Sequence, residues 1–233
     1  MNVNVPDTTA ARGGTVDRVV EDLRAGILGG RYVPGQRLIE ADLTRGLQVS
    51  RGPLREAFRR LSAEGLLQIV PNRGALVRQL SYREIVEIFQ IRSALEPLSA
   101  RLAALAIDQE DKRRRFEAAT RRIWSEARRR DPGYLQENQR FHLAIFAACG
   151  NDQLADFSRQ LQLPLVLLQL SGAKTPGMYL DSVLEHREIA TAILDGDGHA
   201  AEAAMDRHLK RACHIIETMP ESIFRDPQLS RAE

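Results

Sequence analysis

The sequence predicts a mainly α-helical protein, with an N-terminal winged helix-turn-helix and a C-terminal all-helical bundle. Aromatic residues make up only 5% of the 233 residues, which favours helices over strands. Apolar residues recur at helical spacing through most of the chain. Two strand-like runs, 67–70 and 75–79, follow one such helical pattern directly and are joined by a Pro-Asn-Arg-Gly turn.

The first elements of the winged module can be ordered from their end signals. Residues 1–14 are small and polar and end in two glycines, so we expect a flexible arm there. Thr15 is the expected N-cap of a helix with an apolar stripe, which Gly29 and Gly30 end. A short helix is expected over 39–46.

The third helix of the module has the clearest ends. Ser50 is the expected N-cap, Pro53 falls in the first turn, where its missing N–H costs little, and Gly65 is a C-terminal stop. The helix therefore spans about 51–64. Three helices followed by a hairpin are the order of a winged helix-turn-helix.

Arginines share one face of this third helix. Arg51, Arg55 and Arg59 are spaced i, i+4, i+8 and lie away from the apolar stripe. In this fold the start of the third helix enters the DNA major groove, where the arginine fork matches guanine O6 and N7. We expect Arg51 and Arg55 at bases, Arg59 nearer the backbone, and Arg73 of the hairpin tip at a phosphate or in the minor groove. The alternative is a solvated basic helix without a nucleic-acid partner.

Charge is distributed unevenly along the chain, although the net charge is only +2. Residues 1–80 contain 12 Arg and no Lys against 8 acidic residues, whereas the remainder has 21 basic and 23 acidic residues. A basic module joined to a slightly acidic one is consistent with DNA binding by the first.

The run LIEADLTRGLQVSRGPLREAFRRLSAEGLLQIVPNRGALV resembles the DNA-binding domain of GntR-type bacterial transcription regulators. The usual pattern there is close to SR-x-P-[VL]-REAL-x-x-L-x-x-EGL, followed by a wing with PNRGA. The resemblance implies that Arg51 and Arg55 contact bases and that Gly74 forms the wing tip, and we include Ser50 of the motif with them. Some members carry an arginine where this sequence has Ala41, so that contact is missing.

A second domain is expected over 81–219, with 15–80 as the winged module and 220–233 as a C-terminal tail. Ser81 and Glu84 form a capping box before a long helix. Within that helix Arg92 and Glu96 fall on an apolar stripe, and buried charges need partners. Either the two form an internal ion pair, or Arg92 lines a cavity that receives an anionic effector.

Three histidines in this domain are expected to face its core. Asn138 and His142 are i, i+4 neighbours on a helix that begins near Asp131 and Pro132. His186 and His208 lie on the apolar stripes of helices over 179–194 and 200–219. Because a tight turn joins these two helices, both histidines come nearly level.

Three inward histidines with an asparagine offer the ligands of a divalent transition metal ion. The alternative is that each is a hydrogen-bonded core histidine. The arrangement is similar to the metal-binding effector domain of FadR-like GntR regulators, whose [DN]-x3-H, EH-x-x-I and last-helix histidine elements match Asn138, His142, His186 and His208.

The same resemblance implies Zn²⁺, with Ni²⁺ or Mn²⁺ as alternatives, and matches Arg92 to an R-x-x-[LI]-E segment. Asn138 replaces the commoner aspartate, which should weaken metal retention and leave more positive charge for a carboxylate effector.

The predicted function is a homodimeric, ligand-responsive regulator that binds an inverted-repeat operator in double-stranded DNA and a small carboxylate effector. A repressor is favoured, with an activator as the other possibility. The alternative is a metal-dependent hydrolase, with Glu185 beside His186 as a candidate base. The apolar run 163–170 is too short to cross a membrane, and no signal peptide begins the chain, so we expect a cytoplasmic protein without a membrane partner.

Overall fold

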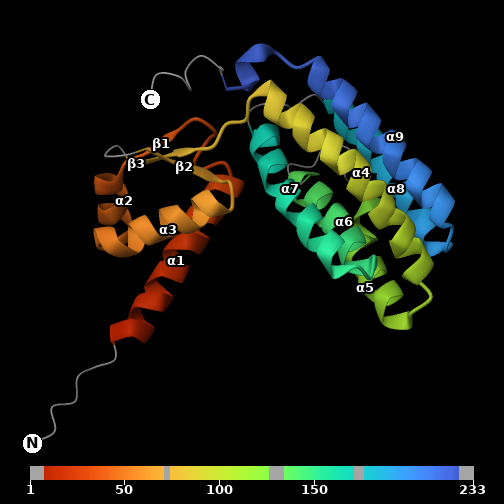
Figure 1. Ribbon diagram of the computed structural model, residues 1–233, viewed down its shortest axis with the longest axis horizontal. Helices are drawn as coiled ribbons and strands as arrows, with labels where there is room; N and C mark the ends of the chain where they lie inside the picture. The colour runs from red at the N-terminus through yellow and green to blue at the C-terminus, as the bar shows by residue number, and fades with distance from the viewer. Residues whose placement is uncertain (1–7, 71–73, 126–133, 171–175, 226–233) are drawn as a thin grey trace, which may run out of the picture. The chain divides into compact units, whose positions relative to one another are not determined.

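The computed structural model describes residues 8–70, 74–125, 134–170 and 176–225, and the chain divides into two compact units, 1–79 and 80–233 (Figure 1). The division lies one residue before the boundary expected from the sequence. The two units are a winged helix-turn-helix and an all-helical domain, so the predicted fold class is confirmed.

The first unit combines helices with a small antiparallel sheet of strand order β1-β3-β2. Its elements are α1 (Thr8–Leu28), β1 (Arg37–Leu38), α2 (Glu40–Leu47), α3 (Arg51–Ala63), β2 (Leu67–Val70) and β3 (Gly74–Val77). Strand β1 was not predicted, because two residues are too few to produce an alternating pattern. It pairs with β3 through Arg37 opposite Leu76 and Leu38 opposite Ala75.

Helix α1 begins at Thr8, so the predicted N-cap at Thr15 and the predicted arm over 1–14 were wrong for residues 8–14. The glycines before Thr15 suggested a break, but a glycine inside a helix costs only about 1 kcal/mol relative to alanine. Residues 1–7 lie outside the described part of the chain. The helix ends at Leu28, as Gly29 and Gly30 predicted.

The core of the first unit lies between α1, α3 and the sheet. Leu23 and Ile27 of α1 are fully buried, as are Leu54 and Leu61 of α3. These are the stripes that the apolar periodicity predicted, and they leave the arginine face of α3 outside the core.

Gly74 starts β3 in a conformation that requires glycine. Its φ is +92°, and a Cβ atom there would lie 2.5 Å from the carbonyl oxygen of Leu38. We therefore expect Gly74→Ala to destabilise the first unit by at least about 1 kcal/mol. The cost of a left-handed backbone for alanine and the cost of the clash with the Leu38 carbonyl oxygen add to each other. Thermal unfolding should show a lower Tm for this variant.

Gly46 in α2 provides the control, since a Cβ added there would meet nothing within 4 Å. Gly46→Ala should leave the Tm unchanged or raise it. Equal Tm values for Gly74→Ala and the wild type would contradict the strain argument.

The second unit is helical in every described element. In chain order these are α4 (Tyr82–Ala106), α5 (Glu110–Thr120), a 3₁₀ turn (Arg121–Trp124), α6 (Tyr134–Ala148), α7 (Asp152–Leu170), α8 (Pro176–Leu194), α9 (Gly198–Glu217) and a second 3₁₀ turn (Glu221–Ile223). The capping box at the start of α4 is confirmed: Ser81 Oγ accepts from the Glu84 amide, and Glu84 Oε2 accepts from the Ser81 amide at 2.8 Å. The helix start expected near Asp131 and Pro132 lies outside the described residues.

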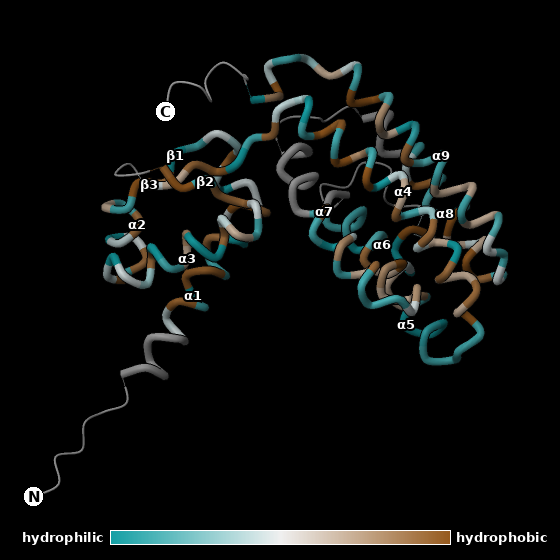
Figure 2. The backbone as a smooth tube through the Cα atoms, viewed as in Figure 1, coloured by the Kyte–Doolittle hydropathy of each residue, from teal (hydrophilic) through white to brown (hydrophobic). Residues whose placement is uncertain are grey.

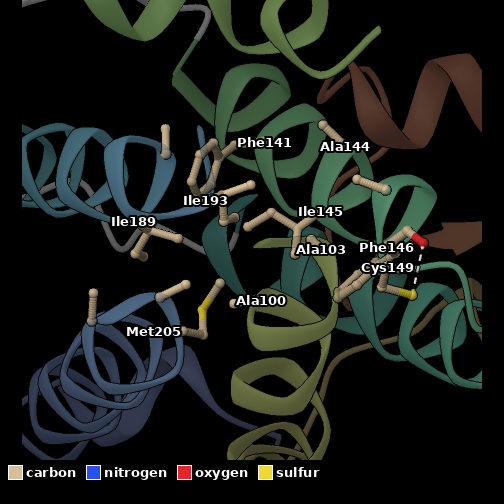
Figure 3. Packing of buried hydrophobic residues seen from close by; sticks show 14 of the residues in the cluster. Ala100, Ala103, Phe141, Ala144, Ile145, Phe146, Cys149, Ile189, Ile193 and Met205 are labelled. Carbon is tan, nitrogen blue, oxygen red and sulfur yellow. Dashed lines mark hydrogen bonds between the residues drawn. The ribbon is translucent and has the colours of Figure 1, made fainter. Parts of the chain in front are cut away.

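Helices α4, α6, α8 and α9 share one apolar core. Figure 2 shows hydrophobic positions recurring between hydrophilic ones along α4 and α9. Figure 3 shows Ala100 of α4 beside Met205 of α9, with Ile189 and Ile193 of α8 close by. Small residues on α4 let the neighbouring helices approach closely, which is how the histidine-bearing helices come together.

The first residues of the expected C-terminal tail, 220–233, pack on the second unit. The Arg225 amide donates to the Leu80 carbonyl oxygen at 2.9 Å, and its guanidinium pairs with Glu84 at 3.1 Å. The Phe224 ring contacts Tyr82 edge to face. Among the described helices, none has the length and apolar character needed to cross a membrane.

Candidate nucleic-acid interface and metal centre

A groove of about 520 Å³ lies between α3 and the sheet of the first unit. Arg51, Arg55 and Arg59 of α3 all line it, together with Gly74 of the wing. Arg37 of β1 also lines the groove, and sequence reasoning missed it because β1 itself was missed. The predicted arginine face is thus assembled into one concave basic surface.

The arginines of this groove differ in how they are held. Arg55 Nε donates to both carboxylate oxygens of Glu40 at 3.0 Å, and this hydrogen bond raises the Arg55 pKa. Arg59 pairs with Glu56 at 2.9 Å on its own helix. Arg51 is exposed at the first position of α3. The guanidinium of Arg55 is therefore oriented by α2 before any ligand binds.

The remaining predicted DNA-contacting residues can be located only in part. Ser50 precedes α3 in an extended conformation and is exposed, but its side chain makes no capping hydrogen bond, so its predicted N-cap bond was wrong. Because the start of α3 is exposed, water can bind the backbone amides of its first turn in place of the Ser50 side chain. Arg73 lies outside the described residues.

Three histidines converge inside the second unit. His142 of α6, His186 of α8 and His208 of α9 are each at most 4% exposed, and one ligand atom from each lies within 4.8 Å of the others. Phe141 stacks on the His186 ring with their centroids 4.1 Å apart. The predicted convergence of the three histidines is confirmed. Asn138 lies one turn before His142 on the same helix and stays a predicted ligand.

Three of the histidine ring nitrogens are buried without a hydrogen bond. Nδ1 and Nε2 of His142 and Nε2 of His186 have no hydrogen-bond partner among the described residues. A buried polar atom left unpaired costs about 1–3 kcal/mol. Burial lowers the pKa of His186 well below its ordinary value of 6.5. Burial likewise lowers the pKa of His208 to about 4, against the opposing effect of Glu185. Both rings are neutral at pH 7, which is the form that binds metals.

Carboxylates lie against two of these rings. His208 Nδ1 forms a hydrogen bond with Glu185 Oε2 at 2.7 Å, and Arg211 holds the same carboxylate at 2.8 Å. His142 Nδ1 lies 2.7 Å from Glu96 Oε2, a close polar contact whose alignment falls short of a hydrogen bond. Burial alone would raise the pKa of Glu96, but Arg92 and His142 outweigh it and lower that pKa to about 2.

Arg92 forms the internal ion pair that the sequence left as one of two possibilities. Its Nε lies 2.5 Å from Glu96 Oε1, and both side chains are buried. Gln162 of α7 donates to the same oxygen at 3.1 Å, and the Arg92 guanidinium lies 4.8 Å from the centre of the Phe89 ring. A role of Arg92 in effector binding stays a prediction, since an effector would have to share Arg92 with Glu96.

These residues fit a divalent transition metal ion. Neutral imidazoles suit Zn²⁺, Ni²⁺ and related ions, and unpaired buried ring nitrogens are the atoms such an ion would satisfy. Two Zn–N bonds at a tetrahedral angle place their nitrogens ~3.3 Å apart. The three ligand atoms lie within 4.8 Å of one another, so they would move closer together by up to ~1.5 Å when an ion binds.

Comparison with known families gives one match in each of the two units. Residues 15–77 match the family "Bacterial regulatory proteins, gntR family", and residues 87–211 match the FCD domain, which spans more than half of the chain. This chain belongs to the GntR family of transcription regulators. The winged unit of this GntR regulator is therefore its DNA-binding domain, and the helical unit is its FCD domain.

Relatives and solved structures agree with this assignment. The regulator is 34% identical to the "Probable D-xylose utilization operon transcriptional repressor" of Paenarthrobacter nicotinovorans, over 77% of this chain and 79% of that one. It is 30% identical to the transcriptional repressor RspR of Escherichia coli, over 83% and 85% of the two chains. A GntR regulator from Rhodococcus sp. RHA1 has the same fold, with a TM-score of 0.76 at 23% identity, over 89% of this chain and all of that one.

Proposed function

We propose that this GntR regulator is a repressor whose FCD domain binds a divalent metal ion and a small carboxylate effector. The observation that carries the proposal is the convergence of three buried histidines, two of which keep an unpaired Nε2. The names of the two relatives above support repression, since one is named a probable repressor and the other a repressor.

On the DNA side, Arg51 and Arg55 are proposed to contact bases and Arg59 to contact the backbone. Arg37, across the groove from α3, is proposed to bind a phosphate, because it lies on the sheet rather than at the helix start. Gly74 keeps the wing close to this surface, and Ser50 lies at its edge.

In the FCD domain His142, His186 and His208 would hold the ion, with Asn138 as a fourth ligand. A bound dication supplies positive charge and open coordination positions, which suit a carboxylate. An effector acts by binding two arrangements of the protein with different affinity, so effector binding at this site would shift operator binding.

Elemental analysis of the purified protein, followed by gel shifts, tests this proposal. A duplex that the protein itself selects from random DNA serves as the operator. We expect about one transition metal ion per chain, and release of the duplex by at least one member of a panel of small organic acids. That release should be lost after chelation. A protein that binds no metal, or an acid response that chelation leaves intact, would overturn the metal-dependent sensor.

The hydrolase alternative receives no support from the residue proposed as its base. Both carboxylate oxygens of Glu185 are engaged, by Arg211 and His208. A general base needs an oxygen free to take a proton from water. Glu185 is better suited to hold His208.

Homodimerisation is proposed through the FCD domain. Ile91, Leu98 and Leu105 of α4 are 49%, 39% and 63% exposed and lie seven residues apart, so they form one apolar stripe on a single helix face. A second copy is a suitable occupant because an inverted repeat requires two-fold symmetry and a symmetric contact repeats each residue.

We expect Leu98→Glu to weaken dimerisation of the full chain by about 100-fold or more, because each dimer loses two buried leucines at ~1.5–3 kcal/mol each. Sedimentation at micromolar concentration measures the change. Leu184→Glu on α8 is the matched control, since Leu184 is 52% exposed and lies off the stripe. A Leu98→Glu protein that sediments as the wild-type dimer would place the interface elsewhere.

A further inference from the structure

Two carboxylates contact the histidine cluster, each at the Nδ1 atom of one ring. Glu96 Oε2 lies 2.7 Å from His142 Nδ1, and Glu185 Oε2 lies 2.7 Å from His208 Nδ1. From the sequence, Glu96 was considered only as a partner of Arg92, and Glu185 only as the base of the hydrolase alternative. The two distances are equal, although only the Glu185 contact has hydrogen-bond geometry. Two such contacts on two different histidines, made from two different helices, indicate a common role.

We propose that Glu96 and Glu185 are positioning residues of the metal centre, each holding the Nδ1–H of one histidine so that Nε2 keeps its lone pair for the ion. This inference rests on the proposed function, because it concerns the same three histidines. A carboxylate behind a histidine fixes its tautomer and ring orientation and increases its basicity as a ligand.

The carboxylates are themselves held firmly. Arg92 and Gln162 bind Oε1 of Glu96, which leaves Oε2 directed to His142. Arg211 binds Glu185 from α9, the helix that also carries His208. Each glutamate is thus anchored by an arginine on one side and meets an imidazole on the other. This explains why a charged Glu96 is tolerated although it is 1% exposed.

Glu96 and Glu185 also affect the charge around the proposed metal site. The neutral ligand set of three histidines and Asn138 was expected to leave a dication uncompensated. Glu96 pairs with Arg92, and Glu185 pairs with Arg211. Each carboxylate lies directly behind one of the ligands, so the charges around the ion would include more than the ligand set.

The two glutamates should not contribute equally. Glu96 is buried and connects α4 with α6 and α7, whereas the Glu185 side chain is 22% exposed and connects α8 with α9. Water can partly replace Glu185 but cannot reach Glu96. Removal of the Glu96 charge should therefore cost more metal affinity.

Metal affinity tests the inference. Zn²⁺ dissociation constants are measured by chelator competition on the full-length wild type, Glu96→Gln and Glu185→Gln, which keep side-chain size and remove the charge. We expect both variants to bind 10–100-fold more weakly, Glu96→Gln the more so. The visible spectrum of the Co²⁺-loaded protein should shift in both variants, which a change remote from the ligands would not cause.

Each glutamate has a control on its own helix. Glu87 of α4 pairs with Arg83, and Glu188 of α8 pairs with Arg207, both at exposed positions. Glu87→Gln and Glu188→Gln should bind Zn²⁺ as the wild type does. Wild-type affinity in both Glu96→Gln and Glu185→Gln would overturn the inference while leaving the metal site intact. A wild type that binds no Zn²⁺ would overturn the metal site and the inference together.

A second measurement needs neither metal nor a buried substitution. Long-range ¹⁵N–¹H spectra of the metal-free wild type report which ring nitrogen of each histidine carries the proton. We expect the Nδ1–H tautomer for His142 and His208. The Nε2–H tautomer at both would contradict the positioning role even if Glu96→Gln failed to fold.

Discussion

His186→Ala is expected to abolish metal retention and effector response together, with operator binding preserved. The change removes one of only three buried imidazoles at the site, which should cost more than the 10–100-fold typical of residues behind the ligands. The winged unit contains none of the ligands, so the metal-free protein should still fold there and bind DNA. On one preparation, elemental analysis measures metal retention, and gel shifts measure operator binding and the effector response.

His186 has a suitable control in His199, which is the second residue of the neighbouring helix α9 and is exposed. His199→Ala should retain the metal and the effector response. Because His186→Ala also removes the partner of the Phe141 ring, circular dichroism must show that the FCD domain still folds. Full effector sensitivity in a His142, His186, His208 triple alanine variant would return the three histidines to a structural role.

Arg51→Ala should weaken operator binding by ~1–3 kcal/mol, or about 5–150-fold, while nonspecific binding at low salt falls less. The reason is that a bidentate contact to a guanine is specific to sequence, whereas the lost charge affects every duplex equally. Arg55→Ala should behave similarly, since Glu40 already orients the guanidinium of Arg55. Titrations with the selected operator and with a random duplex, at several salt concentrations, measure specific and nonspecific binding separately.

Arg60→Ala is the matched control on the same helix. Arg60 pairs with Asp17 of α1 and does not line the groove, so its removal should change binding little on either duplex. If Arg51→Ala weakened binding equally on operator and random DNA, Arg51 would contact phosphates and not bases.

The winged unit could be predicted nearly in full because its signals are local. Pro53 and Gly65 bound α3 within the sequence itself, and the stripe that contains Leu54 and Leu61 determines which face is buried. The two prediction errors in this unit, at the start of α1 and at the unpredicted strand β1, have local causes too. The glycines before Thr15 did not stop α1, and β1 is too short to leave a pattern and exists only through its pairing with β3.

For the site, the sequence by itself determined that His142, His186 and His208 face inward, since helical periodicity specifies the buried face of each helix. Only the tertiary structure decided which side chains meet them. Glu96 and His142, or Glu185 and Arg211, come from different helices, and helix periodicity carries no information about the neighbouring helix or the rotamer that reaches it. The choice between a cavity arginine and an ion pair at Arg92 likewise depended on rotamers, which are set by packing.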